Sequence, residues 1–292
     1  MHLRSQFFPF SLWLALLLAP AVTLLAQPTS TATFTATSTP TLRINEVLAS
    51  SSTLPDTIEL FNAGTTAIDL AGKSLSDDAA RPRKYPFPAG VSIAAGAYLV
   101  VYADSATTPG LHTGFALDAE GDQVRLYDSG GGTAPPLIDF IAFGFQIPNR
   151  SISRTGTGAN VWALTAPTLG AVNGSPLALG EPSSLKLNEW AGKIRYRLDH
   201  DMIELFANSA FPVAIGQVRL TDNIGQPTRF RFPLLSFIAE RGYLPLYGAD
   251  FAFGLDGDLE TISLLGENNP VSYTHLRAHE TKANLVCRLL LE

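Results

Sequence analysis

The sequence predicts an all-β protein built from two tandem β-sandwiches, and three observations lead to this prediction. The 292 residues include 24 glycines and 20 prolines, so turns must be frequent and long helices are disfavoured. Hydrophobic residues make up 46% of the chain and charged residues 16%, which is enough apolar material for a sizeable core. The same order of short apolar segments also occurs twice along the chain, as expected for a repeated module.

The first 26 residues are typical of a signal peptide. A weakly positive start at Arg4 precedes an apolar run from Phe7 to Ala26. Small Ala26 stands before polar Gln27, so we expect cleavage between them and export of the remaining chain. A retained membrane anchor is the alternative, since the run is nearly long enough to cross a bilayer, but two prolines interrupt it. No membrane insertion is expected after cleavage.

Two further segments fall outside the expected sandwiches. Residues 27–41 consist almost entirely of Thr, Ser, Ala and Pro, a composition that stays extended and predicts a linker. Residues 272–292 contain the only cysteine, Cys287, and two of the five histidines, and they break the β pattern. This tail resembles translated adapter or vector sequence, so we interpret it as non-native. A genuine amphipathic terminal helix is the alternative.

The charge of the remaining chain disfavours one class of partner. Without residues 1–26 and 272–292, the basic residues number 20 − 4 = 16 and the acidic residues 26 − 2 = 24, giving a formal net charge of −8. Such a surface repels phosphate backbones, so nucleic-acid binding is not expected. No cysteine remains either, so the sandwiches must be stable without disulfides despite an oxidising destination.

The internal repeat sets the expected domain boundaries. The matched pairs are 42–47 with 185–190, 56–62 with 201–208, 75–77 with 220–222, 85–88 with 230–233, 96–104 with 242–250, and 115–118 with 253–256. Alternation of polar and apolar residues, as in Gln123–Asp128, predicts half-buried strands, whereas the apolar run Tyr98–Tyr102 predicts a strand covered on both faces. We expect a first sandwich at 42–175, a linker at 176–184, and a second sandwich at 185–271.

The first unit resembles the bacterial lamin tail domain. The motifs that carry the resemblance are Ile44-Asn45-Glu46, Ile58–Asn62, Leu70-Ala71-Gly72, Gly96–Val101, Gly121–Asp128, Ser153-Arg154 and Pro167–Asn173. The resemblance covers about residues 42–175 and implies an immunoglobulin-like sandwich. Residues 185–271 resemble the same domain more weakly, since they lack the closing Ser-Arg and Pro-Thr-x-Gly-x-x-Asn stretches, and we interpret this second copy as truncated.

One carboxylate pattern occurs in both units. Asn45-Glu46 with Glu59 is repeated as Asn188-Glu189 with Glu204. Two carboxylates at this spacing could form an acid–base pair for catalysis. Carboxylates and amides at strand ends also bond loop amides, and we favour this structural interpretation. We therefore predict no catalytic residues. The two histidines outside the tail and the signal, His112 and His200, lie in different units.

Acidic turns supply the candidate metal ligands. Asp199-His200-Asp201 with Glu204 has the residue types of a metal cluster, although the first unit has no equivalent histidine. Oxygen ligands at alternate positions suit calcium better, and two matching turns carry them. The calcium candidates are Asp118, Glu120 and Asp122 in the first unit and Asp256, Asp258 and Glu260 in the second. Solvated acidic turns are the favoured alternative, and no other cofactor is expected.

These observations predict an exported, non-catalytic binding, display or adhesion protein at the cell surface. Members of the resembled family are usually accessory modules of secreted or surface proteins, often beside hydrolase or kinase-like domains. We expect loops to bind an unidentified protein or glycan. Exposed aromatic residues of those loops, Trp162 and Trp190 included, could contribute, although burial is the commoner alternative for aromatic side chains. Two alternatives remain open: the N-terminal accessory part of a larger secreted enzyme, and a structural spacer without a ligand.

Overall fold

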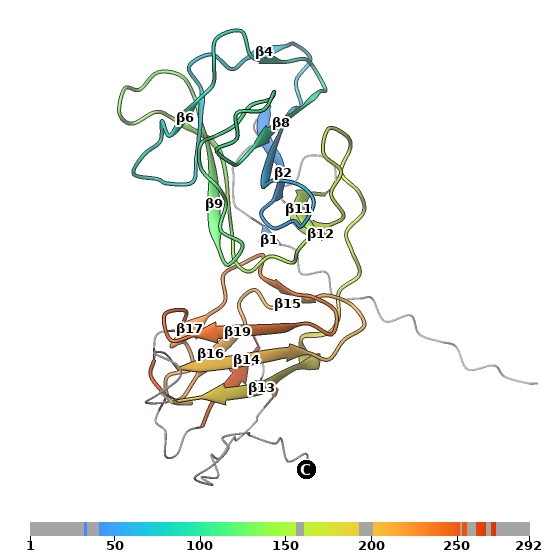
Figure 1. The fold of residues 1–292 in the computed structure, drawn as a ribbon, viewed down its shortest axis with the longest axis vertical. Coiled ribbons are helices and arrows are strands. Elements are labelled where there is room, and N and C mark those ends of the chain that lie inside the picture. The colour runs from blue at the N-terminus through green and yellow to red at the C-terminus, as the bar shows by residue number, and fades with distance from the viewer. Residues whose placement is uncertain are drawn as a thin grey trace, which may run out of the picture.

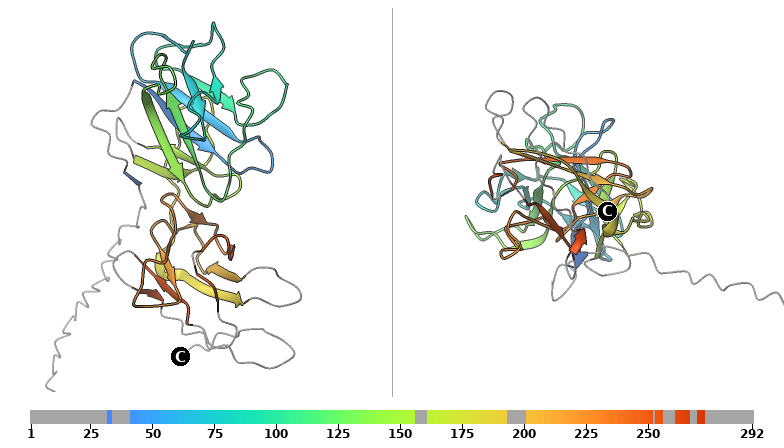
Figure 2. Two further views of the ribbon diagram at one scale, coloured as in Figure 1. Left: turned by 90° about the vertical axis from the view of Figure 1, so that its left-hand side faces the viewer. Right: turned by 90° about the horizontal axis from the view of Figure 1, so that it is seen from below.

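Two β-sandwiches stack along the long axis of the molecule (Figures 1 and 2). The computed structural model describes residues 32–33, 41–155, 161–192, 201–251, 253–255, 261–266 and 270–272. The expected signal peptide, most of the expected linker before Leu42, and the tail after Ser272 lie outside the described residues. Within the described part of the chain, no helix is long and apolar enough to cross a membrane.

The first sandwich packs a six-stranded sheet against a four-stranded one. The larger sheet has the order β1 (Ala32–Thr33), β12 (Val161–Thr165), β11 (Ser151–Arg154), β2 (Leu42–Leu48), β3 (Thr57–Asn62) and β8 (Tyr98–Tyr102). The smaller sheet has the order β10 (Leu137–Phe143), β9 (Asp122–Tyr127), β5 (Ser74–Ser76) and β6 (Tyr85–Pro86), and β4 (Ile68–Asp69) pairs separately with β7 (Ser92–Ile93). Alternate apolar residues such as Ile58 and Leu60 face Val124 and Leu126 in one buried core, as the period of two requires.

The second sandwich repeats this arrangement after a short 3-10 turn, η1 (Pro182–Ser184). One sheet has the order β13 (Leu185–Ala191), β14 (Met202–Ala207) and β19 (Tyr243–Tyr247). The other has the order β17 (Phe230–Arg231), β16 (Arg219–Thr221), β20 (Ser263–Leu265) and β21 (Pro270–Ser272), and β15 (Val213–Ala214) pairs with β18 (Phe237–Ile238). Its own core includes Leu187, Ile203, Leu220 and Leu264.

The two units share local details as well as strand order. The ladder β2–β3 shifts register between Ile44 and Glu46, and the ladder β13–β14 shifts at the equivalent step, between Leu187 and Glu189. The stacked rings of Phe61 and Tyr98 have centroids 4.7 Å apart. Their counterparts in the second unit, Phe206 and Tyr243, are also 4.7 Å apart. The structure therefore confirms the predicted all-β fold with two tandem sandwiches.

The structure decides two expectations about particular positions. Trp162 and Trp190, considered as exposed loop residues that could bind a ligand, are 0% and 4% exposed on β12 and β13, so the alternative of buried aromatic residues holds. Both rings lie at inward strand positions, where burial of a large aromatic surface is most favourable. The strand at 98–102 is also not covered on both faces: Tyr98, Val100 and Tyr102 are only half-buried, because β8 is the last strand of its sheet.

The two units exchange side chains at their junction. Phe145 leaves the first unit and packs in the second core, 5.8 Å from the ring of Phe232. Leu235 and Phe237 come from the second unit and pack in the first core. Backbone bonds fix this exchange, with Phe237 N–H donating to the Phe145 carbonyl at 2.8 Å and Gly144 N–H donating to the Leu234 carbonyl at 3.2 Å. Each core thus depends on residues from the other unit.

Candidate functional site

The outer face of the sheet β2–β3–β8 in the first unit is covered by the chain itself. We call residues 167–173 the closing segment, since they lie across this face. Thr168 donates to Glu46 through its backbone N–H and its hydroxyl, both at 2.9 Å, and Gly170 N–H donates to Glu59. Gly170 adopts a φ of +81°, a conformation that few other residues tolerate. Glu46 and Glu59 are both fully buried as a result.

Two asparagines join the closing segment to the strand bulge. Asn45 Nδ2 donates to Glu59 at 2.7 Å and to the side-chain oxygen of Asn173 at 2.8 Å. Asn173 Nδ2 in turn donates to the Arg154 carbonyl at 2.8 Å. Asn45 can reach both partners because it is the residue left over at the register shift of β2. In the first unit, Glu46 and Glu59 therefore accept hydrogen bonds from the closing segment, and Glu59 also accepts one from the side-chain amide of Asn45.

A buried ion pair links β11 of the larger sheet to β10 of the smaller one. The Arg154 guanidinium donates to both oxygens of Asp139, at 2.7 and 2.8 Å, and to the Ile44 carbonyl at 2.7 Å. It also lies 4.6 Å from the ring centroid of Trp162. Ile44 N–H donates to Asp139 at 2.8 Å, so one arginine and one aspartate hold β2, β10 and β11 together. Burial raises the pKa of Asp139, and Arg154 opposes that shift.

The pKa of Glu59 predicts a pH dependence of stability. Burial raises this pKa above its ordinary value of 4.5, the amide of Gly170 and the side chain of Asn45 oppose the rise, and the charge of Glu46 adds to it. A raised carboxyl pKa stabilises the fold below the ordinary value and loses that contribution as pH rises through the raised pKa. We expect the free energy of unfolding to fall over this window relative to that of Glu59→Gln, in urea titrations at successive pH values. Parallel pH profiles for the two proteins would contradict this assignment.

The equivalent face of the second unit is open. Asn188 Nδ2 donates to Glu204 at 2.5 Å, as Asn45 does to Glu59, but Glu189 is exposed and Glu204 only half-buried. On β19, Tyr243 is 56% exposed and Tyr247 is 46% exposed. We call this surface the second outer face, and the strands that carry it lie side by side in Figure 1. Its residues are Lys186, Asn188, Glu189, Met202, Glu204, Phe206, Tyr243, Pro245 and Tyr247.

Our sequence analysis did not predict this exposed face, although the sequence of the strand at its edge indicates it. Tyr243 and Tyr247 stand four residues apart, so they share one side of a strand. Pro245 between them lacks the N–H that a central strand needs, which indicates an edge strand. The stacking of Tyr243 on Phe206 then follows from cross-strand pairing. An exposed aromatic pair was therefore predictable here.

The calcium candidates of the first unit cap their own turn. Asp118 accepts from Glu120 N–H at 2.9 Å, and Asp122 accepts from the amides of Asp118 and Gln123 at 3.0 and 2.7 Å. Burial raises the pKa of Asp122, although these amides oppose the shift. In the second unit, Asp256, Asp258 and Glu260 lie outside the described residues. Among the residues that the structure describes, no three His, Cys, Asp or Glu side chains form a group suited to a metal. Calcium binding stays a prediction.

The other metal candidates are only partly described. Asp199 and His200 lie outside the described residues. Asp201 accepts from Leu255 N–H at 2.9 Å, which repeats the bond from Leu117 N–H to Asp56 at 3.1 Å in the first unit. The interaction thus belongs to the repeated architecture of the two sandwiches.

The sequence analysis also did not predict that Asp104 is a partner of His112. Its Nδ1 lies 2.5 Å from an Asp104 oxygen, and its ring lies 5.2 Å from that of Tyr102. Burial raises the pKa of Asp104, but bonds from His112 and Ala106 outweigh this and lower it overall. Because His112 also lies opposite Tyr102 in an isolated backbone bridge, the pair fastens the 103–112 loop to β8. The eight-residue separation offered no regular spacing that could have predicted it.

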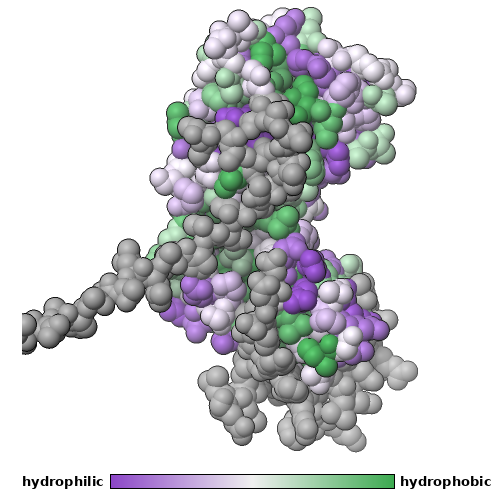
Figure 3. Space-filling view, turned by 180° about the vertical axis from the view of Figure 1, so that it is seen from behind, coloured by the Kyte–Doolittle hydropathy of each residue, from purple (hydrophilic) through white to green (hydrophobic). Residues whose placement is uncertain are grey.

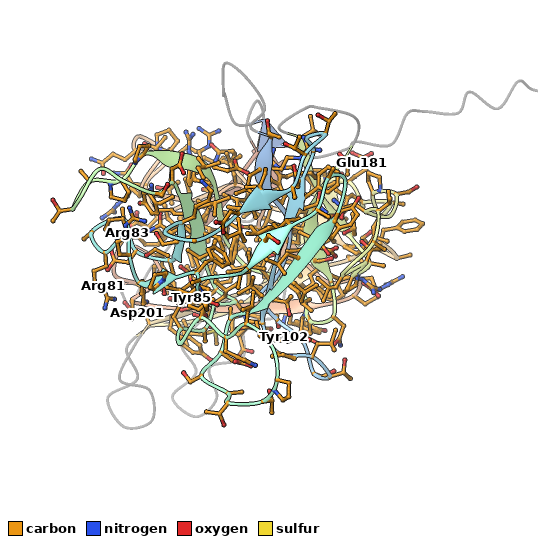
Figure 4. The ribbon with its side chains drawn as sticks, turned by 90° about the horizontal axis from the view of Figure 1, so that it is seen from above. Arg81, Arg83, Tyr85, Tyr102, Glu181 and Asp201 are labelled. Carbon is orange, nitrogen blue, oxygen red and sulfur yellow. The ribbon has the colours of Figure 1, made fainter. Side chains whose placement is uncertain are left out.

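Two basic side chains of the first unit, Arg81 and Lys84, pair with aspartates close to them in sequence. Arg81 donates to Asp78 at 2.8 Å, and Lys84 reaches both oxygens of Asp77 at 2.5 and 2.6 Å. Figure 4, the view from above, shows Arg81 and Arg83 at one side of the sandwich, apart from Tyr102. The second unit repeats the Lys84 pair as Arg229 with Asp222. These cations therefore support hairpins.

Comparison with known proteins identifies part of the chain. Residues 35–144 match the family model of the Lamin Tail Domain. That domain is an immunoglobulin-like, non-catalytic binding or structural module, which agrees with the sandwich formed by these residues. Neither the curated proteins nor the solved structures include a match.

Proposed function

We propose, on the premise that residues 35–144 form a lamin tail domain, that this chain is an exported binding protein of the cell surface. The signal-like residues 1–26 and the Thr/Ser/Pro-rich residues 27–41 support export and display. The second sandwich is a second, lamin-tail-like copy in this proposal. The repeated strand order and the repeated bulge before Glu46 and Glu189 support that assignment.

The exposed aromatic surface of the second outer face is the observation that carries the proposal. Tyr243 and Tyr247 are among the most exposed large apolar side chains of the described strands, and Phe206 stacks on Tyr243. Such rings provide rigid contact area with a polar edge, and the carboxylates of Glu189 and Glu204 beside them are acceptors for hydrogen bonds from a ligand. We therefore place the ligand on this sheet face. Figure 3, the view from behind, shows the opposite side of the molecule, where hydrophobic side chains lie in separate groups among polar ones.

A binding screen with a matched control tests the proposal. Glycan arrays and a panel of cell-surface proteins are probed with the full chain and with Tyr243→Ala/Tyr247→Ala. We expect at least one ligand whose affinity falls about tenfold or more in the double variant, since aromatic anchors dominate interfaces. The control, Leu54→Ala/Leu137→Ala, removes exposed apolar side chains from the first unit and leaves binding unchanged. A ligand that binds the Tyr243→Ala/Tyr247→Ala variant as tightly as the unaltered chain would show that the binding site lies elsewhere. A screen in which nothing binds would favour a structural spacer without a ligand.

A further inference from the structure

We infer that the closing segment, residues 167–173, is a pH-sensitive strap of the first unit. It lies on the β2–β3–β8 face at acidic pH and lifts from that face as Glu59 loses its proton, while the sandwich beneath it stays folded. Two buried carboxylates face each other under the segment, and the segment itself has neither a buried residue nor an ionisable side chain. This device belongs to the first unit and is independent of any ligand of the second.

The two carboxylates beneath the segment lie directly opposite each other. Glu46 on β2 and Glu59 on β3 are cross-strand partners, and both are 0% exposed. None of the ion pairs that the structure describes includes either residue. Like charges at opposite positions of a sheet repel each other, and burial strengthens this repulsion. The closed face is therefore least favourable when both carboxylates are charged.

Hydrogen bonds from the segment offset only part of this cost. Thr168 donates to Glu46 through its N–H and its hydroxyl, both at 2.9 Å, and Gly170 N–H donates to Glu59. Burial nevertheless raises the pKa of Glu59, although the Gly170 amide and the Asn45 side chain oppose this rise. The charge of Glu46 adds to it. A carboxyl whose pKa is raised by closure favours the closed state below its ordinary pKa, and this contribution is lost as pH rises through the raised value.

The other charged groups near Glu59 are engaged elsewhere. On β8, burial raises the pKa of Tyr98 and the charge of Glu59 adds to that rise, while Arg43 opposes it, so the phenol stays neutral. Arg43 on β2 lies over a neighbouring phenylalanine ring, and the Arg154 guanidinium on β11 pairs with the aspartate of β10. The facing pair of Glu46 and Glu59 is therefore the group whose titration responds to closure.

The closing segment is lightly held on this face. None of its residues is buried, and Val172 is 76% exposed. Among the described backbone–backbone bonds, its contribution is internal, from Ala171 N–H to the Thr168 carbonyl at 3.0 Å. At its far end, the side chain of Asn173 donates to the Arg154 carbonyl at 2.8 Å. Segments with so few buried contacts open at a low cost in free energy, so this one can lift while β2, β3 and β8 stay paired.

Lifting exposes acceptor groups that the closed face conceals. The carboxylates of Glu46 and Glu59 then reach solvent. The side chain of Asn45, which donates to Glu59 and Asn173 in the closed state, is released with them. The access of a ligand to this face therefore rises with pH.

Hydrogen exchange of the full chain, measured by mass spectrometry from about pH 4 to about pH 8, tests the strap. The amides of Thr168 and Gly170 donate to the two carboxylates, so their protection, corrected for the intrinsic pH dependence of exchange, reports closure. We expect this protection to lie well below that of the Val124 and Leu126 amides of β9 at every pH. We also expect it to fall several-fold as pH rises.

Three variants assign the pH dependence to the facing carboxylates. Glu59→Gln keeps the shape of the side chain and removes its charge, so the protection of the Thr168 amide should depend little on pH. Glu46→Gln removes the opposing charge and should also weaken the dependence, which gives the same test from the other strand. Glu120→Gln changes an exposed carboxylate of the same unit and should leave the dependence unchanged.

Three results would overturn the strap. The first is protection of the Thr168 and Gly170 amides that stays level across the pH series. The second is the same pH dependence in Glu59→Gln as in the unaltered chain. The third is protection equal to that of the β9 amides at every pH, because the segment would then open only when the whole sandwich unfolds.

Discussion

Replacing Arg154 with leucine is expected to lower the free energy of unfolding of the first sandwich by about 3–5 kcal/mol, since it leaves a buried carboxylate unpaired. Arg154 is 5% exposed and supplies the hydrogen bonds to both Asp139 oxygens. Burial already raises the pKa of Asp139 against the influence of Arg154, so loss of the arginine removes what opposes the cost of burial. Urea unfolding followed by near-ultraviolet circular dichroism measures the effect.

A second variant separates the buried charge from lost packing. In Arg154→Leu/Asp139→Asn the neutral amide can still accept from Ile44 N–H, and we expect more than half of the lost stability to return. As a surface control, Arg81→Ala breaks an exposed pair with Asp78 and should change stability little. A loss for Arg154→Leu no larger than that for Arg81→Ala would contradict the assigned role of the buried pair.

Replacing Phe237 with alanine is expected to destabilise the first sandwich, although Phe237 belongs to the second. Its side chain is 2% exposed and packs in the first core, so truncation leaves a cavity there that costs about 3–5 kcal/mol. Hydrogen exchange followed by mass spectrometry should show faster exchange in β2 and β3 as well as around β18. Phe211→Ala removes an exposed aromatic side chain of the same unit and is the matched control. Changes confined to residues 185–272 would contradict the shared junction.

Local pattern was sufficient to predict the fold class and the repeat. The alternation in Gln123–Asp128 depends only on neighbouring residues, and β9 follows it with Val124 and Leu126 buried. The side-chain exchange at the junction had no such signal. Phe145 and Phe237 look like ordinary core residues in sequence, and only the packing of the two units decides which core each one enters.

The sequence predicted which residues form the candidate site, but it did not predict which of their side chains are exposed. The repeated Asn-Glu and Glu positions were evident, yet the partner of Asn45 is Asn173, 128 residues away in the chain. Coverage by such a distant segment decides whether Glu46 and Glu59 are buried. For a related reason Trp162 and Trp190 are buried, since they alternate inward on strands, while Tyr243 and Tyr247 are exposed on theirs.

Carboxyl footprinting of the full chain measures whether one sheet face is covered in the first unit and open in the second. Carbodiimide coupling of a small amine, read residue by residue by mass spectrometry, reports the accessibility of each carboxylate. We expect extensive labelling of Glu189 and Glu204 and protection of Glu46 and Glu59, with exposed Glu240 as the reference. Equal labelling of the two pairs, or protection of Glu189 and Glu204 in the unliganded chain, would contradict it.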